Sequence, residues 1–266
     1  LKLESNFGVI SHQKLNMSIQ VIKKEDQADG NFNNGEILEK KPIGFPQDGG
    51  KIRPYSNIFY WAHAWTPKGK STIGLHPHQG FEICSFVLEG SINHFDTKQE
   101  KWISLEKGDV QIIRAGNGIS HAEELNEKSE IFQIWFDPNI QHSITKEASY
   151  DDYKSNDFEI SENNRIKVKK IAGGNSPMKI FSEGIEINSY EIPSNIESDF
   201  EIQKNAIYSY FILDGEVTVN KETAEKGDFI IVSEVNNINI TANSKTKVFE
   251  IKSPSRPSYS TYSERF

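Results

Sequence analysis

The sequence has few of the features that mark a secreted or membrane-spanning protein. It contains one cysteine, Cys84, in 266 residues, so no disulfide can form within the chain. No apolar run approaches the roughly 20 residues that a membrane-spanning helix needs, and the first residues show no apolar signal-peptide core. We expect a cytoplasmic protein by default, although the chain starts at Leu1 and not at Met.

Positive charge does not gather anywhere along the sequence. Asp and Glu outnumber Lys and Arg by 38 to 30, which gives a formal net charge of −8. Lysines alternate with glutamates, as in residues 36–41, which is typical of a solvated surface. Nucleic-acid-binding domains usually carry a basic patch. We therefore expect a small-molecule substrate or a protein partner, no direct contact with nucleic acid or membrane, and a monomer as the favoured state.

Short β-strands dominate the pattern, and no segment shows a sustained helical period. Segments rich in β-branched and aromatic residues are separated by Gly, Asn, Asp or Pro, which is typical of a β-sandwich or barrel. These segments are residues 58–61, 82–88, 110–113, 131–136, 166–171, 180–187, 207–213, 229–232 and 247–251. A short helix around residues 149–154 is a further hypothesis.

Two short sequence words occur twice in the same order. Residues 86–90 (Phe-Val-Leu-Glu-Gly) return as residues 211–215 (Phe-Ile-Leu-Asp-Gly), and the word Glu-Lys-Gly-Asp at 106–109 returns at 225–228. Chance is the alternative, but the conserved order favours an internal duplication.

The duplication suggests two domains with a connection between them. Residues 145–164 are rich in Asp, Glu, Asn and Ser and are interpreted as a linker. We predict an N-terminal domain at 1–144 and a C-terminal domain at 165–266, which includes a Pro/Ser-rich tail.

All seven histidines lie in the first part of the chain, up to His142, and the second copy has none. His76 and His78 are separated by Pro77, and His121 and Glu123 by a single residue. Alternate side chains of an extended strand point to one face, so each pair can offer two ligands to one ion. Imidazoles suit iron, copper, nickel or zinc, and four protein ligands leave two positions open on a six-coordinate ion. Either pair alone is explained by turn or buried histidines; together they favour a metal site.

The residues around both pairs match a known family. Residues 76–90 resemble the first cupin motif as it occurs in the pirins. Residues 108–123 resemble the second pirin motif, including Ala-Gly-x-Gly-Ile before the histidine, and residues 131–136 resemble the strand that follows. The resemblance is close over residues 75–136, thin before Pro54 and only architectural after Phe158.

The resemblance implies an all-β fold of two tandem cupin (jelly-roll) β-barrel domains, with one divalent metal ion in the N-terminal barrel. The implied ligands are His76, His78, His121 and Glu123. Family members usually hold iron, so Fe2+ is the expected ion, with Zn, Mn, Ni and Cu as alternatives. Gln79 departs from the family, which often has Arg or Lys there; the lost cation weakens attraction for an anionic substrate and puts the substrate class, not metal binding, in doubt.

The second copy serves as an internal comparison. The offsets of the two repeated words carry the four implied ligands onto Glu201, Gln203, Ile240 and Ala242. These residues do not form a metal-binding set, so we predict that the C-terminal barrel is structural.

Three residues after the first histidine pair are candidates for the surroundings of the ion. Glu82, Cys84 and Phe86 share strand parity with the pair if no bulge intervenes. Glu82 would then hydrogen-bond an imidazole, and the other two would line the barrel interior. The alternatives are an outward Glu82 after a bulge at Gly80 and, for Cys84, a small core residue rather than a nucleophile.

Two other histidines have weaker patterns. His63 lies in an aromatic segment, where it lines the pocket entrance or serves packing alone. His94 follows the turn at Gly90, which favours a rim or surface position over a fifth ligand.

The functional hypothesis combines this site with the resemblance. Some pirins cleave flavonols such as quercetin with dioxygen, and a eukaryotic member is a nuclear cofactor of transcription. We expect a quercetin 2,3-dioxygenase-like oxidoreductase acting on a flavonol or related enol, with Glu123 as the catalytic base. The alternative is a non-enzymatic, iron-dependent redox sensor that binds a protein partner. A third reading is oxygen-independent isomerase chemistry of the cupin type.

Overall fold

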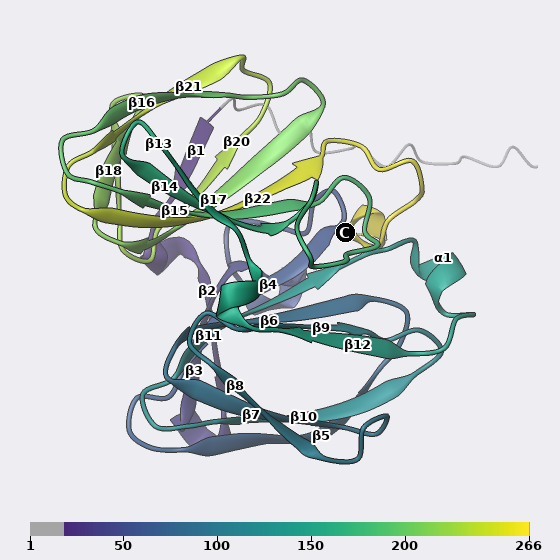
Figure 1. The fold of residues 1–266 in the computed structure, drawn as a ribbon. Coiled ribbons are helices and arrows are strands. Elements are labelled where there is room, and N and C mark those ends of the chain that lie inside the picture. The colour runs from purple at the N-terminus through teal and green to yellow at the C-terminus, as the bar shows by residue number, and fades with distance from the viewer. Residues whose placement is uncertain (1–18, 266) are drawn as a thin grey trace, which may run out of the picture.

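The computed structural model describes residues 19–265 and shows an all-β protein built from two barrels (Figure 1), as the sequence predicted. Each barrel pairs a seven-stranded sheet with a four-stranded sheet. The strand orders are β12-β9-β6-β11-β4-β3-β2 and β5-β10-β7-β8 in the first barrel. They are β1-β20-β17-β22-β15-β14-β13 and β16-β21-β18-β19 in the second.

The strands of the first barrel are β2 (Ala28–Phe32), β3 (Ile37–Ile43), β4 (Ile58–Trp65), β5 (Ser71–His78), β6 (Glu82–Glu89), β7 (Ser91–Asp96), β8 (Trp102–Glu106), β9 (Val110–Arg114), β10 (Ile119–Leu125), β11 (Glu130–Phe136) and β12 (Ser149–Tyr153). Those of the second are β1 (Ile19–Ile22), β13 (Ile160–Asn163), β14 (Ile166–Ala172), β15 (Glu186–Ile192), β16 (Glu197–Glu201), β17 (Ala206–Asp214), β18 (Glu216–Val219), β19 (Glu222–Glu225), β20 (Phe229–Val232), β21 (Asn237–Ala242) and β22 (Thr246–Pro254). The helices are short: α1 (Ile140–Ser143) and the 3-10 turns η1 (Lys24–Asp26), η2 (Asn33–Gly35), η3 (Pro46–Asp48), η4 (Ser155–Asp157) and η5 (Tyr262–Arg265).

The two seven-stranded sheets pack face to face, and their facing side chains form the largest apolar core. Trp61 of β4 is fully buried at its centre. Its ring lies 5.2 Å from that of Phe229 and 5.7 Å from that of Phe249, both in the second barrel. Since side chains alternate along a strand, every second residue of these sheets points into this core and the others point into a barrel.

The strand pairing of the two barrels agrees with the duplication seen in the sequence. In the first barrel β11 pairs with β6 so that Phe132 lies opposite Phe86. In the second barrel β22 pairs with β17 so that Phe249 lies opposite Phe211. Both phenylalanine pairs belong to the core between the barrels. The repeated words therefore mark equivalent strands.

The chain differs from the sequence-based division at both ends. Strand β1 pairs with β20 and so joins the second barrel, although the sequence places it in the first domain. The C-terminal tail, by contrast, packs on the first barrel. The Tyr259 hydroxyl donates a hydrogen bond of 2.6 Å to the backbone carbonyl of Asp137. The backbone N–H of Tyr262 donates to the carboxylate of the same residue at 2.7 Å. Strand β1 and the tail at residues 259–262 thus each pack on the barrel farther from them in sequence.

Residues 149–153 form neither a helix nor part of a free linker. They are strand β12, which pairs with β9 at the edge of the first barrel's large sheet. Edge strands commonly carry polar residues, and the polar composition of this one led to the earlier interpretation.

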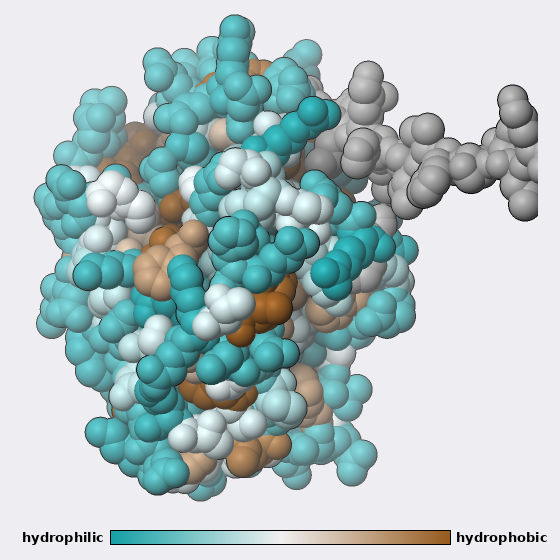
Figure 2. Space-filling model, turned by 90° about the vertical axis from the view of Figure 1, so that its right-hand side faces the viewer, coloured by the Kyte–Doolittle hydropathy of each residue, from teal (hydrophilic) through white to brown (hydrophobic). Residues whose placement is uncertain are grey.

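On the face shown in Figure 2, hydrophilic residues dominate and apolar residues occur in small groups. No helix among residues 19–265 is long and apolar enough to cross a membrane.

Candidate metal centre

Three histidines converge at one end of the first barrel. His76 and His78 lie on β5 and His121 lies on β10, with His121 directly opposite His76. One ring nitrogen from each of the three lies within 4.8 Å of the others. The Nε2 atoms of His78 and His121 are 3.0 Å apart. The i, i+2 spacing therefore places both imidazoles of β5 on one face of the strand, as the sequence suggested, close to His121 of β10.

This arrangement fits a shared divalent ion. Two nitrogens that bind one ion at about 2.1 Å and at right angles to each other lie about 3.0 Å apart. The Nδ1 of His76 lies 2.7 Å from the carbonyl oxygen of Gly74. A hydrogen bond there fixes the ring and leaves Nε2 for an ion. The Nδ1 of His121 is buried without a hydrogen-bond partner.

Burial and neighbouring histidines keep two of these imidazoles neutral. Burial, with the added effect of His121 and His76, lowers the pKa of His78 to about 3. Burial, with His76 and His94, lowers the pKa of His121 to about 2. Only the neutral ring has a lone pair for a metal, so both side chains are in the ligand form at neutral pH.

Glu123 lies deeper in the same barrel, two residues after His121, and is 1% exposed. Its Oε1 accepts a hydrogen bond of 2.8 Å from the Ser85 hydroxyl, and its Oε2 accepts one from the Gln133 amide. The side-chain oxygen Oε1 of Gln133 in turn accepts a hydrogen bond of 3.3 Å from the indole N–H of Trp135. These contacts fix the direction of the carboxylate. Neither Ser85 nor Gln133 was singled out in the sequence, although the alternation of β6 and β11 places both on the inner face.

The four predicted ligands form two overlapping groups in this structure. The first consists of His76, His78 and His121, of which the first two are partly exposed. The second joins His121 and Glu123 to His94, and all three are buried. The expectation that His94 lies at the rim or surface is wrong, because its exposed fraction is 0%.

The expected surroundings of the ion need correction at Glu82, Cys84 and Phe86. Strands β5 and β6 belong to different sheets, and the connection between them contains Gly80 at a φ of +88°. The alternation of side chains therefore restarts at β6. Cys84 and Phe86 point into the core between the barrels and do not line the barrel interior. Burial, together with Glu82, raises the pKa of the Cys84 thiol well above its usual value, which disfavours a thiolate nucleophile.

Glu82 hydrogen-bonds no imidazole and is not at the surface, so both sequence-based readings are wrong. It is fully buried between the barrels. Its carboxylate accepts hydrogen bonds from the backbone N–H groups of Phe181 (2.8 Å) and Ser182 (2.9 Å) and from the Ser182 hydroxyl (2.6 Å). Burial raises its pKa although these donors act in the other direction. Glu82 thus attaches a loop of the second half of the chain to the first barrel.

His63 does not line the pocket entrance. Its Nε2 lies 3.2 Å from Oε2 of Glu130, and its ring contacts those of Phe132 and Phe211 at the junction of the barrels. The packing alternative is the one that the structure favours.

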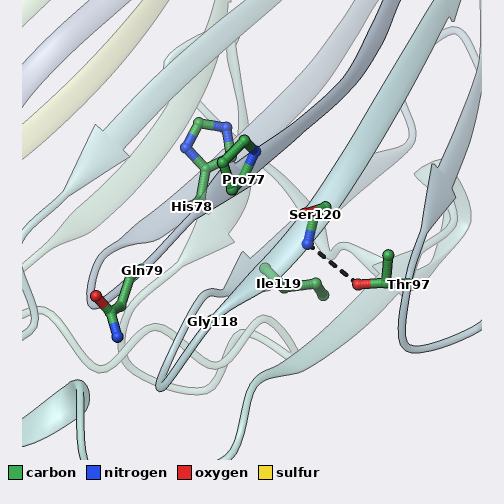
Figure 3. A pocket seen from close by; sticks show the side chains of 7 residues that line it. All are labelled: Pro77, His78, Gln79, Thr97, Gly118, Ile119 and Ser120. Carbon is green, nitrogen blue, oxygen red and sulfur yellow. Dashed lines mark hydrogen bonds between the residues drawn. The ribbon is translucent and has the colours of Figure 1, made fainter.

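A cavity of about 530 Å³ opens beside His78 (Figure 3). Its lining residues are Pro77, His78, Gln79, Thr97, Gly118, Ile119 and Ser120. On another side the His78 ring is flanked by Phe81 and Trp135, each with a ring centroid 5.3 Å away. Trp135 is stacked on Tyr60 at 4.4 Å. His78 therefore contacts both the cavity and a group of aromatic side chains.

The corresponding positions of the second barrel are unlike these. Ile240 and Ala242 are buried in its apolar core, and Glu201 and Gln203 are exposed.

Comparisons with known proteins agree with the motifs. Residues 53–136 match the family model Pirin. The chain is 35% identical over 132 residues to Pirin-like protein 2 of Arabidopsis thaliana, an alignment that covers 49% of this chain and 38% of that protein. It is 27% identical over 178 residues to quercetin 2,3-dioxygenase of Escherichia coli K12, covering 66% of this chain and 73% of that protein. The chain thus spans well under half of the first relative and about three quarters of the second.

Solved structures show the same fold. The crystal structure of the bacterial pirin YhhW from Escherichia coli in complex with nickel(II) superposes with a TM-score of 0.74 at 21% identity. The superposition covers 89% of this chain and 99% of that one. The motifs at residues 76–90 and 108–123 lie within the matched segment. The chain therefore contains a Pirin domain at residues 53–136 and is similar in fold to a bacterial pirin.

Proposed function

We propose that this chain is a metal-dependent dioxygenase of the pirin type, which cleaves a flavonol such as quercetin, or a related enolic substrate, with dioxygen. The observation that carries the proposal is the convergence of the ring nitrogens of His76, His78 and His121 beside an open cavity. These three histidines and Glu123 would hold one divalent ion, which we propose to be iron. When bound, such an ion supplies Lewis acidity and, as iron, a centre for dioxygen chemistry.

The protein's own residues suit an aromatic, hydroxylated substrate. Phe81 and Trp135 beside His78 make that side of the site apolar, which suits a substrate with a planar ring system. The Gln79 amide, at the cavity wall, offers a donor and an acceptor for substrate hydroxyls. Relatives named quercetin 2,3-dioxygenase support this choice of substrate class.

Glu123 is proposed to take the proton of the substrate hydroxyl. Each of its oxygens accepts one hydrogen bond, and a carboxylate oxygen has a second lone pair that can accept a proton. Ser85 and Gln133 hold the group in a fixed direction, so that no reorientation precedes proton transfer.

The test is turnover by iron-loaded protein on a panel of flavonols and related enols. We expect substrate loss, followed by absorbance, with matching oxygen uptake at an electrode, and neither with His78→Ala. Failure of the panel to show either signal would refute the dioxygenase. Turnover that continues without oxygen would indicate isomerase chemistry, and iron-dependent capture of a protein partner without turnover would indicate a regulatory role.

A further inference from the structure

His94 is buried inside the first barrel, next to the proposed ligands. It lies on β7 directly opposite Glu123 of β10, and its exposed fraction is 0%. Its ring centroid is 5.3 Å from that of His121. A polar ring in such a place needs partners for both nitrogens.

One nitrogen of His94 has a partner. Its Nε2 lies 3.3 Å from Oδ2 of Asp96, which is also fully buried. The Asp96 carboxylate is held in turn by the backbone N–H groups of Lys98 and Gln99, each at 2.8 Å, and by the Gln99 side-chain amide at 3.1 Å. An acceptor-only carboxylate at this position makes Nε2 the protonated nitrogen of His94.

The other nitrogen, Nδ1, is buried and has no hydrogen-bond partner. Donation of one ring N–H to a carboxylate, with the second nitrogen left bare, is the usual arrangement of a metal-binding histidine. His63 is a useful contrast, because it is also buried and faces a carboxylate but lies outside both ligand groups.

The His94 ring is close to two of the proposed ligands. A ring nitrogen of His94, a ring nitrogen of His121 and a carboxylate oxygen of Glu123 lie within 4.8 Å of one another. Two ligands of one ion, each at about 2.1 Å, are at most about 4.2 Å apart, so small side-chain adjustments bring all three onto one ion. His121 belongs to this inner group and to the outer group with His76 and His78.

We propose that the barrel has a second, inner position for the metal ion, formed by His94, His121 and Glu123. The outer, partly exposed group and the buried inner group would offer two adjoining positions to the one ion, with His121 common to both. Two nitrogens and one carboxylate suit a divalent transition ion. Asp96 acts as a positioning residue, since it sets which nitrogen of His94 is free. The inference rests on the proposed metal binding and adds a ligand to it.

The experiment compares Co(II) binding to wild-type protein, His94→Ala and the control His63→Ala. We expect His94→Ala to weaken Co(II) binding at least about tenfold, as loss of a metal-supporting group does, and to change the visible absorption of the bound Co(II). His63→Ala should change neither. Wild-type affinity and spectrum in His94→Ala would overturn the inference.

A measurement on the wild-type protein covers the case in which His94→Ala fails to fold. In Co(II)-loaded protein labelled with 15N-histidine, ring N–H protons of ligating histidines have strongly shifted resonances. We expect one from His94 that exchanges slowly, because its Nε2–H is buried against Asp96. Absence of a shifted His94 resonance would overturn the inner position, whereas failure of wild-type protein to bind Co(II) would overturn the proposed function itself.

Discussion

The Ser85 hydroxyl donates a hydrogen bond of 2.8 Å to the carboxylate of Glu123 across the interior of the first barrel. The bond joins β6 of the large sheet to β10 of the small sheet. Ser85 and its neighbour Cys84 lie on opposite faces of β6. Ser85 points into the barrel interior, and Cys84 points into the core between the barrels.

Replacement of Ser85 by Ala should weaken metal binding without unfolding the protein. Glu123 would lose one of the two groups that fix its direction, and loss of a group that supports a ligand typically costs about 10–100-fold in metal affinity. Competition with a chelator measures this change. Cys84→Ala is the matched control and should leave the affinity unchanged; an equal loss in both variants would mean that the assignment of faces on β6 is wrong.

Replacement of Glu82 by Ala should destabilise the fold but not the metal site. The variant leaves three donors without an acceptor: the part-buried N–H of Phe181 and the buried N–H and hydroxyl of Ser182. A buried donor left unsatisfied costs about 1–3 kcal/mol. Urea denaturation measures the loss, and chelator competition should show wild-type metal affinity in the folded variant. Lost affinity with intact stability would instead place Glu82 at the ion.

Replacement of Glu250 by Gln should stabilise the protein at neutral pH. Oε1 of Glu250 accepts hydrogen bonds from the Asn188 amide (2.8 Å) and the Tyr190 hydroxyl (3.0 Å), and the amide oxygen of Gln can do the same. Burial raises the pKa of Glu250 above its usual value, although these donors oppose the shift.

The sign of the pH effect follows from that direction. Because the pKa of Glu250 is higher in the folded state than in the unfolded state, ionisation costs folding free energy above the folded-state pKa. This cost disappears as the pH falls below the unfolded value of about 4.3. The difference in unfolding free energy between Glu250→Gln and wild type should be positive at pH 7 and shrink toward zero near pH 4. A difference that grows on acidification would contradict the account.

Replacement of Gln79 by Arg should favour anionic ligands in the cavity. Gln79 lines the cavity beside His78 (Figure 3), so Arg at this position would place a positive charge at the cavity wall. A charge pair at 4 Å in water is worth about 1 kcal/mol, so we expect roughly fivefold tighter binding of a flavonolate, measured by fluorescence titration. Gln79→Glu should weaken binding by a similar factor, and both effects should fade at high salt. Salt-independent changes of the same sign would exclude an electrostatic origin.

The sequence correctly predicted which ligand residues share a face when those residues lie within a single strand. His76 and His78, like His121 and Glu123, share a face because each pair lies within one strand. The parity argument failed for Glu82, since the chain changes sheets between β5 and β6 and an alternation does not continue across such a turn.

The features that were missed depend on contacts distant in sequence. The pairing of β1 with β20 cannot be read from the local sequence. Strand β1 has only four residues, and its partner lies about 200 residues further along the chain. His94 was placed at a rim because it follows a turn. The spacing His94-Phe-Asp96 equals that of the two recognised pairs, and this similarity was the signal that could have placed it inside the barrel.

The central claim is that the histidines of β5 and β10 bind one metal ion in the first barrel. Elemental analysis of protein purified without added metal tests it most directly, with His121→Asn as the variant and His142→Asn, on the short helix α1, as the control. The account predicts close to one divalent transition ion per chain in wild type and control, and little in His121→Asn. Protein that holds no stoichiometric metal even after loading, or an unchanged content in His121→Asn, would contradict it.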